Sequence, residues 1–144
     1  DGLLAIGGDL SEDLLLEAYN KGIVPWYDES QPFLWWCPDP RMVLFPEKLK
    51  ISKSMRQLLK KKVFKVTFNQ KFPEVIKACS EVKRSGQDGT WITPEMKEVY
   101  SELHQRGFAH SAEAWLHNKL VGGRYGIRIG NVFFGERVSR MQIW

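Results

Sequence analysis

The sequence predicts an α+β fold in which helices pack on a largely antiparallel sheet. Two observations lead to this prediction. Apolar residues recur at helical spacing in several segments of the first two thirds of the 144-residue chain, whereas the last third contains three strand-like runs separated by short turns. Because no helix separates these three runs, we expect them to pair as antiparallel neighbours.

The first part of the chain is expected to form a small lobe over residues 1–41. Ser11 is a suitable N-cap for a helix over 12–21. The lobe is too small for a sufficient core of its own, so we expect it to pack on the remainder of the chain. The stretch WWCPDPR (35–41) has prolines that favour an irregular extended backbone. We interpret it as the connector to a second domain over 42–144, with neither helix nor strand.

The second domain is expected to contain strand, helix, strand, two helices and then the three terminal strands. Thr93 is a suitable N-cap for the last helix, and Pro94 occupies its favoured first position. The pair Gly122-Gly123 weakens the second of the terminal strands or marks a bulge, where the backbone can splay or approach a ligand closely. The expected elements are a strand at 42–45, a helix at 52–61, a strand at 63–68, a helix from Phe72, a helix from Pro94 that ends at Gly107, and strands at 108–116, 120–128 and 132–134.

The composition is that of an ordinary globular protein, with 43% hydrophobic and 26% charged residues. No apolar run reaches the roughly 18 residues that a membrane helix needs, and no signal peptide is recognisable, so we expect a cytoplasmic protein without membrane association. The two cysteines, Cys37 and Cys79, do not have the spacing of a metal site. We interpret both as reduced thiols.

One segment supplies the whole excess of positive charge. Eight of the 21 basic residues lie between Lys48 and Lys65 without an acidic residue among them, which leaves 13 basic residues against all 17 acidic ones elsewhere. Such a segment can bind a polyanion, because neutralised phosphates release their counterions. A solvated helix face explains the same composition, and composition alone does not decide between the two.

The sequence lacks the motifs of several enzyme classes. The sequence has no Walker sequence and no Gly-x-Gly-x-x-Gly after a strand, and its three histidines are not spaced as metal ligands. Around residues 122–130 it also lacks the (Arg/Gln)-x-x-Gly-x-Gly turn that would hold the pyrophosphate of coenzyme A. We therefore expect neither a metal nor a cofactor.

Aromatic residues beside glycine or a carboxylate are the candidates for ligand binding. Trp26 follows a proline, and Trp91 closes the glycine-rich loop before the helix at 94. An indole can stack on a nucleobase, although burial in the core is its more usual fate. Glu136 ends the sequence FFGE, where a carboxylate beside phenyl rings can hold an ammonium group. A solvent-exposed glutamate at a strand end is the alternative.

Taken together and in this order, eight stretches resemble the bacterial leucyl/phenylalanyl-tRNA–protein transferases. Each stretch alone is weak, but the combination is specific and covers nearly the whole chain up to Glu136, after which the sequence departs from the family pattern. The stretches are GLLAIGGDLS (2–11), AYNKGIVPWY (18–27), LWWCPDPRMVLFPE (34–47), ISKSMR (51–56), GTWITPEM (89–96), AHSAEAW (109–115), LVGGRYG (120–126) and FFGE (133–136).

The resemblance implies a small amino-terminal domain followed by an acetyltransferase-like domain of the GNAT superfamily. It implies transfer of Leu or Phe from aminoacyl-tRNA to acceptor proteins that begin with Arg or Lys, which marks them for degradation. The aminoacyl ester is already activated, so the reaction requires no cofactor or metal. Catalysis then consists largely of positioning an amine against an ester. A full-length member is expected to be a monomer.

The resemblance also implies roles for individual residues. Trp26 and Trp91 would contact the terminal adenosine and its aminoacyl group. Glu136, the expected catalytic residue, would hold the α-amino group. The residues expected beside the pocket for the Leu or Phe side chain, or otherwise to bind substrate, are Phe133, Phe134 and Tyr100. The residues expected to meet the acceptor-end phosphates are Lys53, Arg56, Lys60, Lys61 and Lys62.

The family pattern continues with a long carboxy-terminal part that contains the residues proposed to handle the proton. This chain ends before it, so we expect little or no transferase activity from these 144 residues alone, and a sheet edge prone to association. Two other functions stay open. One is a coenzyme A-dependent N-acetyltransferase, which the missing pyrophosphate turn disfavours. The other is a non-catalytic RNA-binding module that uses only the basic helix.

Overall fold

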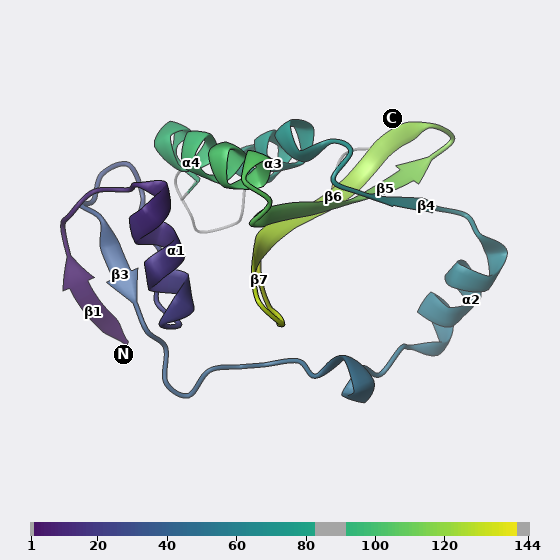
Figure 1. The fold of residues 1–144 in the computed structure, drawn as a ribbon. Helices are drawn as coiled ribbons and strands as arrows, with labels where there is room; N and C mark the ends of the chain where they lie inside the picture. Colours follow the sequence, from purple (N-terminus) through teal and green to yellow (C-terminus); the bar gives the residue numbers. More distant parts are fainter. Residues whose placement is uncertain (1, 83–91, 141–144) are drawn as a thin grey trace.

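The computed structural model of the chain describes residues 2–82 and 92–140. It confirms the α+β class: helices accompany two antiparallel sheets (Figure 1). The amino-terminal elements are β1 (Leu3–Ile6), α1 (Glu12–Asn20), β2 (Val24–Pro25) and β3 (Leu34–Trp36). The later elements are α2 (Lys53–Lys61), β4 (Lys65–Phe68), α3 (Phe72–Glu81), α4 (Pro94–Gln105), β5 (Ala109–Leu116), β6 (Lys119–Ile129) and β7 (Val132–Arg140).

The amino-terminal lobe contains a three-stranded sheet that the sequence did not suggest. Its order is β1-β3-β2, and both neighbours pair with β3 in antiparallel fashion. Trp36 lies opposite Leu3 on one side and Val24 on the other, so the expectation that no strand includes this stretch is wrong. The physical reason is that the prolines come only after Trp36, which leaves both tryptophans free to pair. The irregular connector therefore begins at Cys37.

The lobe shares its core with the rest of the chain. Ser11 caps α1 as expected, because its side chain accepts a hydrogen bond from the backbone N–H of Leu14. Leu15 and Tyr19 of α1 are almost fully buried and belong to one hydrophobic cluster with Tyr100 of α4. This shared cluster fixes α1 against α4 and the larger sheet.

The larger sheet has the order β4-β5-β6-β7, with every neighbouring pair antiparallel. Helices α3 and α4 lie together on one side of it (Figure 1). At Gly123 the sheet lies close against α3, since a Cβ atom there would lie 2.7 Å from Val75 Cγ2, while the close approach of a ligand stays a prediction. The bulge expected at Gly122-Gly123 is present one residue earlier, because the partners change from Ala114–Gly122 to Trp115–Leu120 and leave Val121 without a partner in β5.

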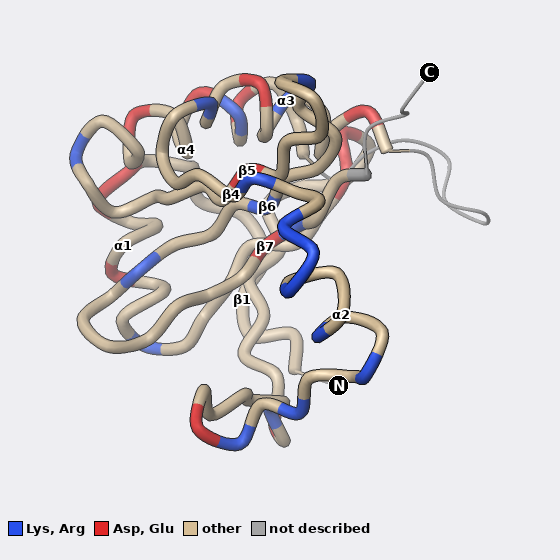
Figure 2. Tube along the Cα trace, turned by 90° about the vertical axis from the view of Figure 1, so that its right-hand side faces the viewer, with Lys and Arg blue, Asp and Glu red and all other residues tan. Residues whose placement is uncertain are grey.

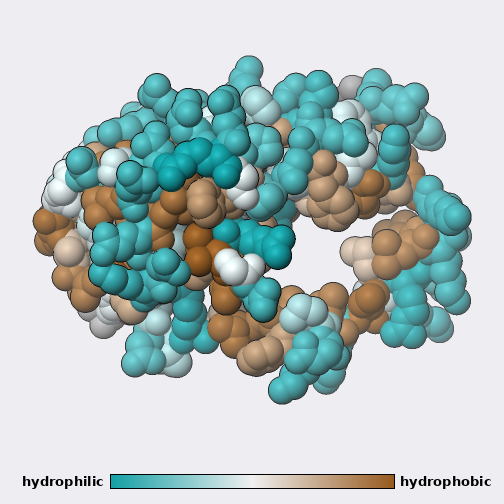
Figure 3. All heavy atoms as spheres, in the orientation of Figure 1, coloured by the Kyte–Doolittle hydropathy of each residue, from teal (hydrophilic) through white to brown (hydrophobic). Residues whose placement is uncertain are grey.

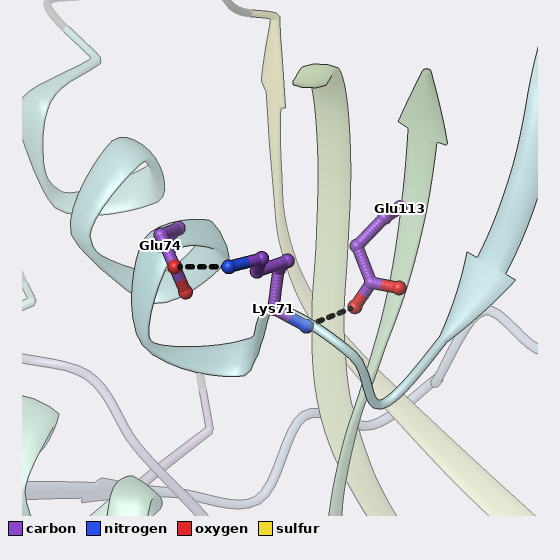
Figure 4. A network of polar contacts seen from close by, with 3 residues as sticks. All are labelled: Lys71, Glu74 and Glu113. Carbon is purple, nitrogen blue, oxygen red and sulfur yellow. Dashed lines mark hydrogen bonds and ion pairs between the residues drawn. The ribbon is translucent and has the colours of Figure 1, made fainter. Parts of the chain in front are cut away.

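A buried carboxylate joins this sheet to the start of α3. Glu113 of β5 is 1% exposed, and it accepts hydrogen bonds from the hydroxyls of Thr67 (2.6 Å) and Ser111 and from the backbone N–H of Lys71 (3.3 Å; Figure 4). Burial alone would raise the pKa of Glu113, but these bonds outweigh it and hold the pKa below its ordinary value. The carboxylate also lies at a helix N-terminus, where negative charge is favourable.

We expect Glu113→Gln to destabilise the fold by about 2 kcal/mol near pH 7, because the amide replaces one accepting oxygen with an NH2 donor that faces other donors. Glu113 has a lowered pKa, so its stabilising effect is present above the unfolded pKa and is lost as pH falls through the folded value. The difference from the unaltered chain should therefore shrink in acid. Urea unfolding from pH 7 to pH 3 measures this. The matched control is Glu74→Gln, which removes only the exposed pair with Lys71 (3.1 Å; Figure 4) and should cost less than about 0.5 kcal/mol.

The segment that leads to α2 differs from its prediction. No strand forms at 42–45, and Met42 is 97% exposed. The apolar residues there suggested a strand, but in the part of the chain that the structure describes no sheet edge pairs with them. A strand requires a partner, and local composition does not supply one.

Helix α2 confirms the basic helix predicted at 52–61. Ser52 caps it through Met55 N–H (3.2 Å), and none of its nine residues is buried. The helix stands apart from the larger sheet (Figure 1), and lysine and arginine are concentrated on it and beside it (Figure 2). Its apolar side chains are also exposed, with Met55 at 50% and Leu59 at 57%. Hydrophobic atoms line much of the opening between α2 and the rest of the molecule (Figure 3).

We expect the 144-residue chain to self-associate as its concentration rises, because large exposed apolar surfaces favour association. Analytical ultracentrifugation at several concentrations measures this. Phe68 on the edge strand β4 is 68% exposed, and Phe68→Lys should weaken the association while leaving the helical content unchanged. A chain that stays monomeric at about 200 μM would contradict this prediction.

Candidate functional site

Glu136 owes its position to a bulge in β7. Tyr125 pairs with Arg137, whereas the next residue, Gly126, pairs with Gly135, so Glu136 is an extra residue on its strand. A bulge re-aims side chains and lets two successive residues face the same way. Glu136 accordingly contacts Tyr19 of α1, and Arg137 donates a hydrogen bond to the Val82 carbonyl just after α3 (3.2 Å). The bulge therefore turns the Glu136 carboxylate toward the helices.

Two tyrosines and Glu136 form a short chain of hydrogen bonds between three elements. The Tyr19 hydroxyl donates to Glu136 Oε1, and its oxygen lies 2.7 Å from the hydroxyl of Tyr100 on α4. Tyr19 and Tyr100 are 1% and 0% exposed. The Tyr19 hydroxyl therefore links Tyr100 to Glu136 by hydrogen bonds. Tyr19 was not among the residues predicted from the sequence, although a tyrosine in the apolar stripe of the first helix needs a polar partner when it is buried, which is a usable signal.

The surroundings of Glu136 raise the pKa of its carboxyl to about 7. Burial is the main cause, and the hydrogen bond from Tyr19 and the charges of Arg41 and Arg124 oppose it. Near neutral pH the site therefore holds the carboxylate and the carboxylic acid in comparable amounts. Burial and the charge of Glu136 raise the pKa values of Tyr19 and Tyr100 well above 10, so their hydroxyls stay protonated and able to donate.

The two phenylalanines of FFGE lie on different faces of the sheet. The Phe134 ring packs edge-on against Tyr19, with ring centroids 5.0 Å apart, and the guanidinium of Arg41 lies 5.4 Å from its centroid. Phe133 is 51% exposed and covers Gly126, where an added Cβ would lie 2.5 Å from Phe133 Cζ. Successive strand residues point to opposite faces. The structure thus brings Phe134, but not Phe133, to Glu136.

Trp26 is held in a half-exposed position by a contact with Trp36 of β3. Its ring centroid lies 5.8 Å from that of Trp36, and Trp36 Nε1 donates a hydrogen bond to the Trp26 carbonyl (2.8 Å). Trp26 is 52% exposed, whereas Trp35 is buried and donates to the Gly7 carbonyl. Trp91 lies outside the described residues, so its expected contact with a nucleoside stays a prediction.

A cavity of about 620 Å³ lies where the amino-terminal lobe meets the start of α4. Its wall includes Tyr27 and Thr93, and among the described residues none of those predicted to bind substrate or RNA lines it. Within the described residues, no group of three or more His, Cys, Asp or Glu side chains is arranged to hold a metal ion. No helix in the described part of the chain is long and apolar enough to cross a membrane.

The predicted RNA-binding side chains are exposed, and they lie away from Glu136. Within residues 2–82 and 92–140, none of these side chains forms an ion pair, so no carboxylate of the described chain neutralises their charges. Figure 1 shows α2 well separated from α1 and β7. The residues concerned are Lys53, Arg56, Lys60, Lys61 and Lys62.

Comparisons with known proteins agree with the motifs. The family model described as leucyl/phenylalanyl-tRNA protein transferase matches residues 43–142, and the model of its N-terminal domain matches residues 8–39. The first match continues past Glu136, where the resemblance of the motifs was expected to end.

Three relatives named leucyl/phenylalanyl-tRNA–protein transferase illustrate the similarity. The protein of Christiangramia forsetii is 64% identical over 138 residues, that of Flavobacterium johnsoniae 59% over 136, and that of Syntrophobacter fumaroxidans 58% over 136. Each match covers 94% of this chain, but only 65%, 64% and 58% of the respective relative. The chain thus spans about three fifths of the length of these relatives.

Proposed function

Since this chain belongs to the leucyl/phenylalanyl-tRNA–protein transferase family, we propose that it takes part in the transfer of Leu or Phe from aminoacyl-tRNA to the amino terminus of acceptor proteins. The acceptors are proteins that begin with Arg or Lys, which the added residue marks for degradation. In this transfer the acceptor amine attacks the ester carbonyl, a C–N bond forms, and the C–O bond to the ribose breaks. The amine loses a proton and the ribose oxygen gains one.

The observation that carries the proposal is the setting of Glu136. Its carboxylate accepts a hydrogen bond from Tyr19 beside the Phe134 ring. A carboxylate next to an apolar ring matches the α-ammonium group and apolar side chain of a leucyl or phenylalanyl ester. Glu136 would then orient the ester for attack, and this positioning accounts for much of the rate in such transfers.

Helix α2 supplies the proposed contact with RNA. Its lysines and arginine are exposed and free of ion pairs within the described residues, which suits them to bind phosphates. These contacts carry no sequence information and would position the RNA. In this arrangement α2 holds the acceptor stem while Trp26 and Glu136 meet its terminal aminoacyl-adenosine.

We also propose the finer description of the fold. The sheet with α3 and α4 on one side is compatible with an acetyltransferase-like domain of the GNAT superfamily over 42–144, preceded by a small domain over 1–41. The separate family models for residues 8–39 and 43–142 support this division. We further propose that the protein works in the cytoplasm and, at full length, as a monomer.

The decisive experiment compares three forms of tRNA for binding to the chain by filter binding. We expect phenylalanyl-tRNA to bind about tenfold more tightly than deacylated tRNA, because one charge-assisted contact is added. N-acetylphenylalanyl-tRNA lacks the ammonium group and should lose this advantage. Equal affinities for all three forms would overturn the proposal and leave a simple RNA-binding module. Binding of acetyl-coenzyme A in its place would indicate an acetyltransferase.

A further inference from the structure

Arg41, the last residue of the stretch WWCPDPR, contacts two elements that border the Glu136 site. Its Nη1 donates a hydrogen bond to the carbonyl of Gly22, just after α1 (2.7 Å). Its guanidinium carbon lies over the Phe134 ring of β7, 5.4 Å from the ring centroid. The side chain of a connector residue therefore joins the end of α1 to β7.

The first contact acts on the end of α1 that carries Tyr19. The Gly22 N–H donates to the Tyr19 carbonyl (3.0 Å), so Gly22 alone links the Arg41 side chain to the Tyr19 backbone. The last turn of α1 has no basic residue, and the C-cap residue Lys21 pairs with Glu17 (2.7 Å). A cation near a helix C-terminus binds free carbonyls and is favoured by the helix dipole. Arg41 supplies such a cation from outside the helix.

The second contact acts on the ring beside the carboxylate. Phe134 packs edge-on against Tyr19, with centroids 5.0 Å apart, and the Tyr19 hydroxyl donates to Glu136. The face of an aromatic ring attracts a cation that lies over it. Arg41 therefore contacts both the turn that follows Tyr19 and the ring that packs against Tyr19.

We propose that Arg41 is a positioning residue of the candidate site, which holds the end of α1 against Phe134 so that the Tyr19 hydroxyl stays in place to donate to Glu136. This inference rests on the proposed function and deepens it, because it gives the connector a task at the candidate site. Arg41 acts through Tyr19 and Phe134 and does not itself bind the aminoacyl ester. The connector thereby couples the packing of the amino-terminal lobe to the carboxylate that would receive the ammonium group.

The charge of Arg41 also acts on Glu136 directly. Burial raises the pKa of Glu136 to about 7, against the hydrogen bond from Tyr19 and the charges of Arg41 and Arg124, which lower it. Burial raises the pKa values of the neighbouring tyrosines well above 10, so they stay uncharged near neutral pH. Loss of Arg41 should therefore raise the pKa of Glu136 by removing a charge and by weakening the bond from Tyr19. The tyrosines of the described chain that face Glu136 are Tyr19, Tyr100 and Tyr125.

Carbon-13 NMR titration of the Glu136 carboxyl tests the proposal without RNA. Arg41→Met keeps an apolar stem but removes the charge and the donor, and its titration midpoint should lie above that of the unaltered chain. Arg41→Lys keeps a cation near the ring and should restore most of the difference. In a Tyr19→Phe chain, Arg41→Met should shift the midpoint less, because residues that act through one another are not additive. No shift, or equal shifts in both backgrounds, would overturn the proposal.

Arg106→Met is the matched control. Arg106 also joins α1 to another part of the chain, because it pairs with Asp13 (3.1 Å) and lies 5.7 Å from the ring centroid of Phe108. Both variants should lower the thermal midpoint of unfolding slightly, but only Arg41→Met should change the titration of Glu136. A lower thermal midpoint of Arg41→Met with an unaltered titration would mean that Arg41 serves the fold alone, which contradicts the proposal.

Binding of tRNA separates this inference from the proposed function. Arg41→Met should reduce the preference for phenylalanyl-tRNA over deacylated tRNA about twofold to fivefold at pH 7, because less of Glu136 is ionised. The ratio of the two affinities cancels any contact of Arg41 with phosphates, and Arg106→Met should leave the ratio unchanged. A ratio that Arg41→Met does not alter would refute the role of Arg41. An unaltered chain without any preference would refute the proposed function instead, and the titration of Glu136 would still decide whether Arg41 positions Tyr19.

Discussion

Replacing Glu136 with Gln should remove the tighter binding of phenylalanyl-tRNA relative to deacylated tRNA. The amide keeps the shape of the side chain but cannot pair with an ammonium group, and a charge-assisted contact of this kind is worth about 1.5–3 kcal/mol, or roughly a tenfold to hundredfold change in affinity. Affinity for deacylated tRNA should be unchanged. Filter binding with both forms of tRNA measures the effect, and a preserved preference would exclude Glu136 from recognition of the ammonium group.

The same variant should change the dependence of binding on pH. The pKa of Glu136 is about 7, so affinity for phenylalanyl-tRNA should increase as pH rises from 6 and the carboxylate forms. An α-amino group loses its proton near pH 8, so the population with both charges, and with it the affinity, should be largest near about pH 7.5 and fall above it. In the Glu136→Gln variant, the increase in affinity as pH rises from 6 should be absent. Tyr19→Phe should shift this increase in affinity to higher pH, because the hydrogen bond from Tyr19 lowers the pKa of Glu136.

Stability measurements distinguish a specific loss of binding from a damaged fold. Glu136 has a raised pKa in the folded chain, so the native state binds more protons than the unfolded state between about pH 4.5 and pH 7. The contribution of Glu136 to the free energy of unfolding therefore decreases as pH rises from about 4.5 to about 7, and it stays lower above pH 7. Glu136→Gln should lose function and yet be as stable as the unaltered chain, or more stable, at pH 8. A site that works at the expense of stability behaves in this way.

The periodic segments of the sequence predicted most of the larger sheet and its helices. The helix at 52–61, the start of α4 at Pro94 and the first two of the terminal strands follow from local spacing and caps. The third was predicted only at 132–134, whereas β7 continues to Arg140, so Glu136 lies within the strand and not at its end. The small sheet of the lobe does not, because its strands are two to four residues long and β1 pairs with β3 across more than 20 positions. The strand expected at 42–45 failed for the converse reason, since its composition was suitable but no partner strand lies beside it within the described residues.

The candidate site was predictable in its residues but not in its geometry. The FFGE motif indicated Glu136, and alternation along a strand could have separated Phe133 from Phe134 in advance. The bulge at Glu136 depends on the register between β6 and β7, which no local pattern encodes. The bond between Tyr19 and Glu136 joins residues 117 positions apart, so it required the fold. The cavity at the start of α4 likewise combines segments that are distant in sequence.

Neutralising the basic face of α2 should reduce the affinity for RNA more than Glu136→Gln does. Removing one phosphate contact lowers the slope of log K against log salt by about 0.7–0.9, so a fourfold Gln variant should lose about 3 units of slope and about 100-fold in affinity at low salt. None of the altered side chains is buried, so the fold should persist. Filter binding between about 50 and 200 mM salt measures both quantities. The four positions are Lys53, Arg56, Lys60 and Lys61.

A second quartet of substitutions tests whether position matters or only net charge. Changing four lysines elsewhere to Gln alters the net charge equally, and this variant should keep most of its affinity. The control positions are Lys21, Lys77, Lys97 and Lys119. Equal losses from both quartets would mean that RNA binds the whole charged surface without a preferred face. Because α2 is well separated from β7, the strand that carries Glu136 (Figure 1), its effect should be the same for aminoacylated and deacylated tRNA, and the losses from the two sites should add in free energy.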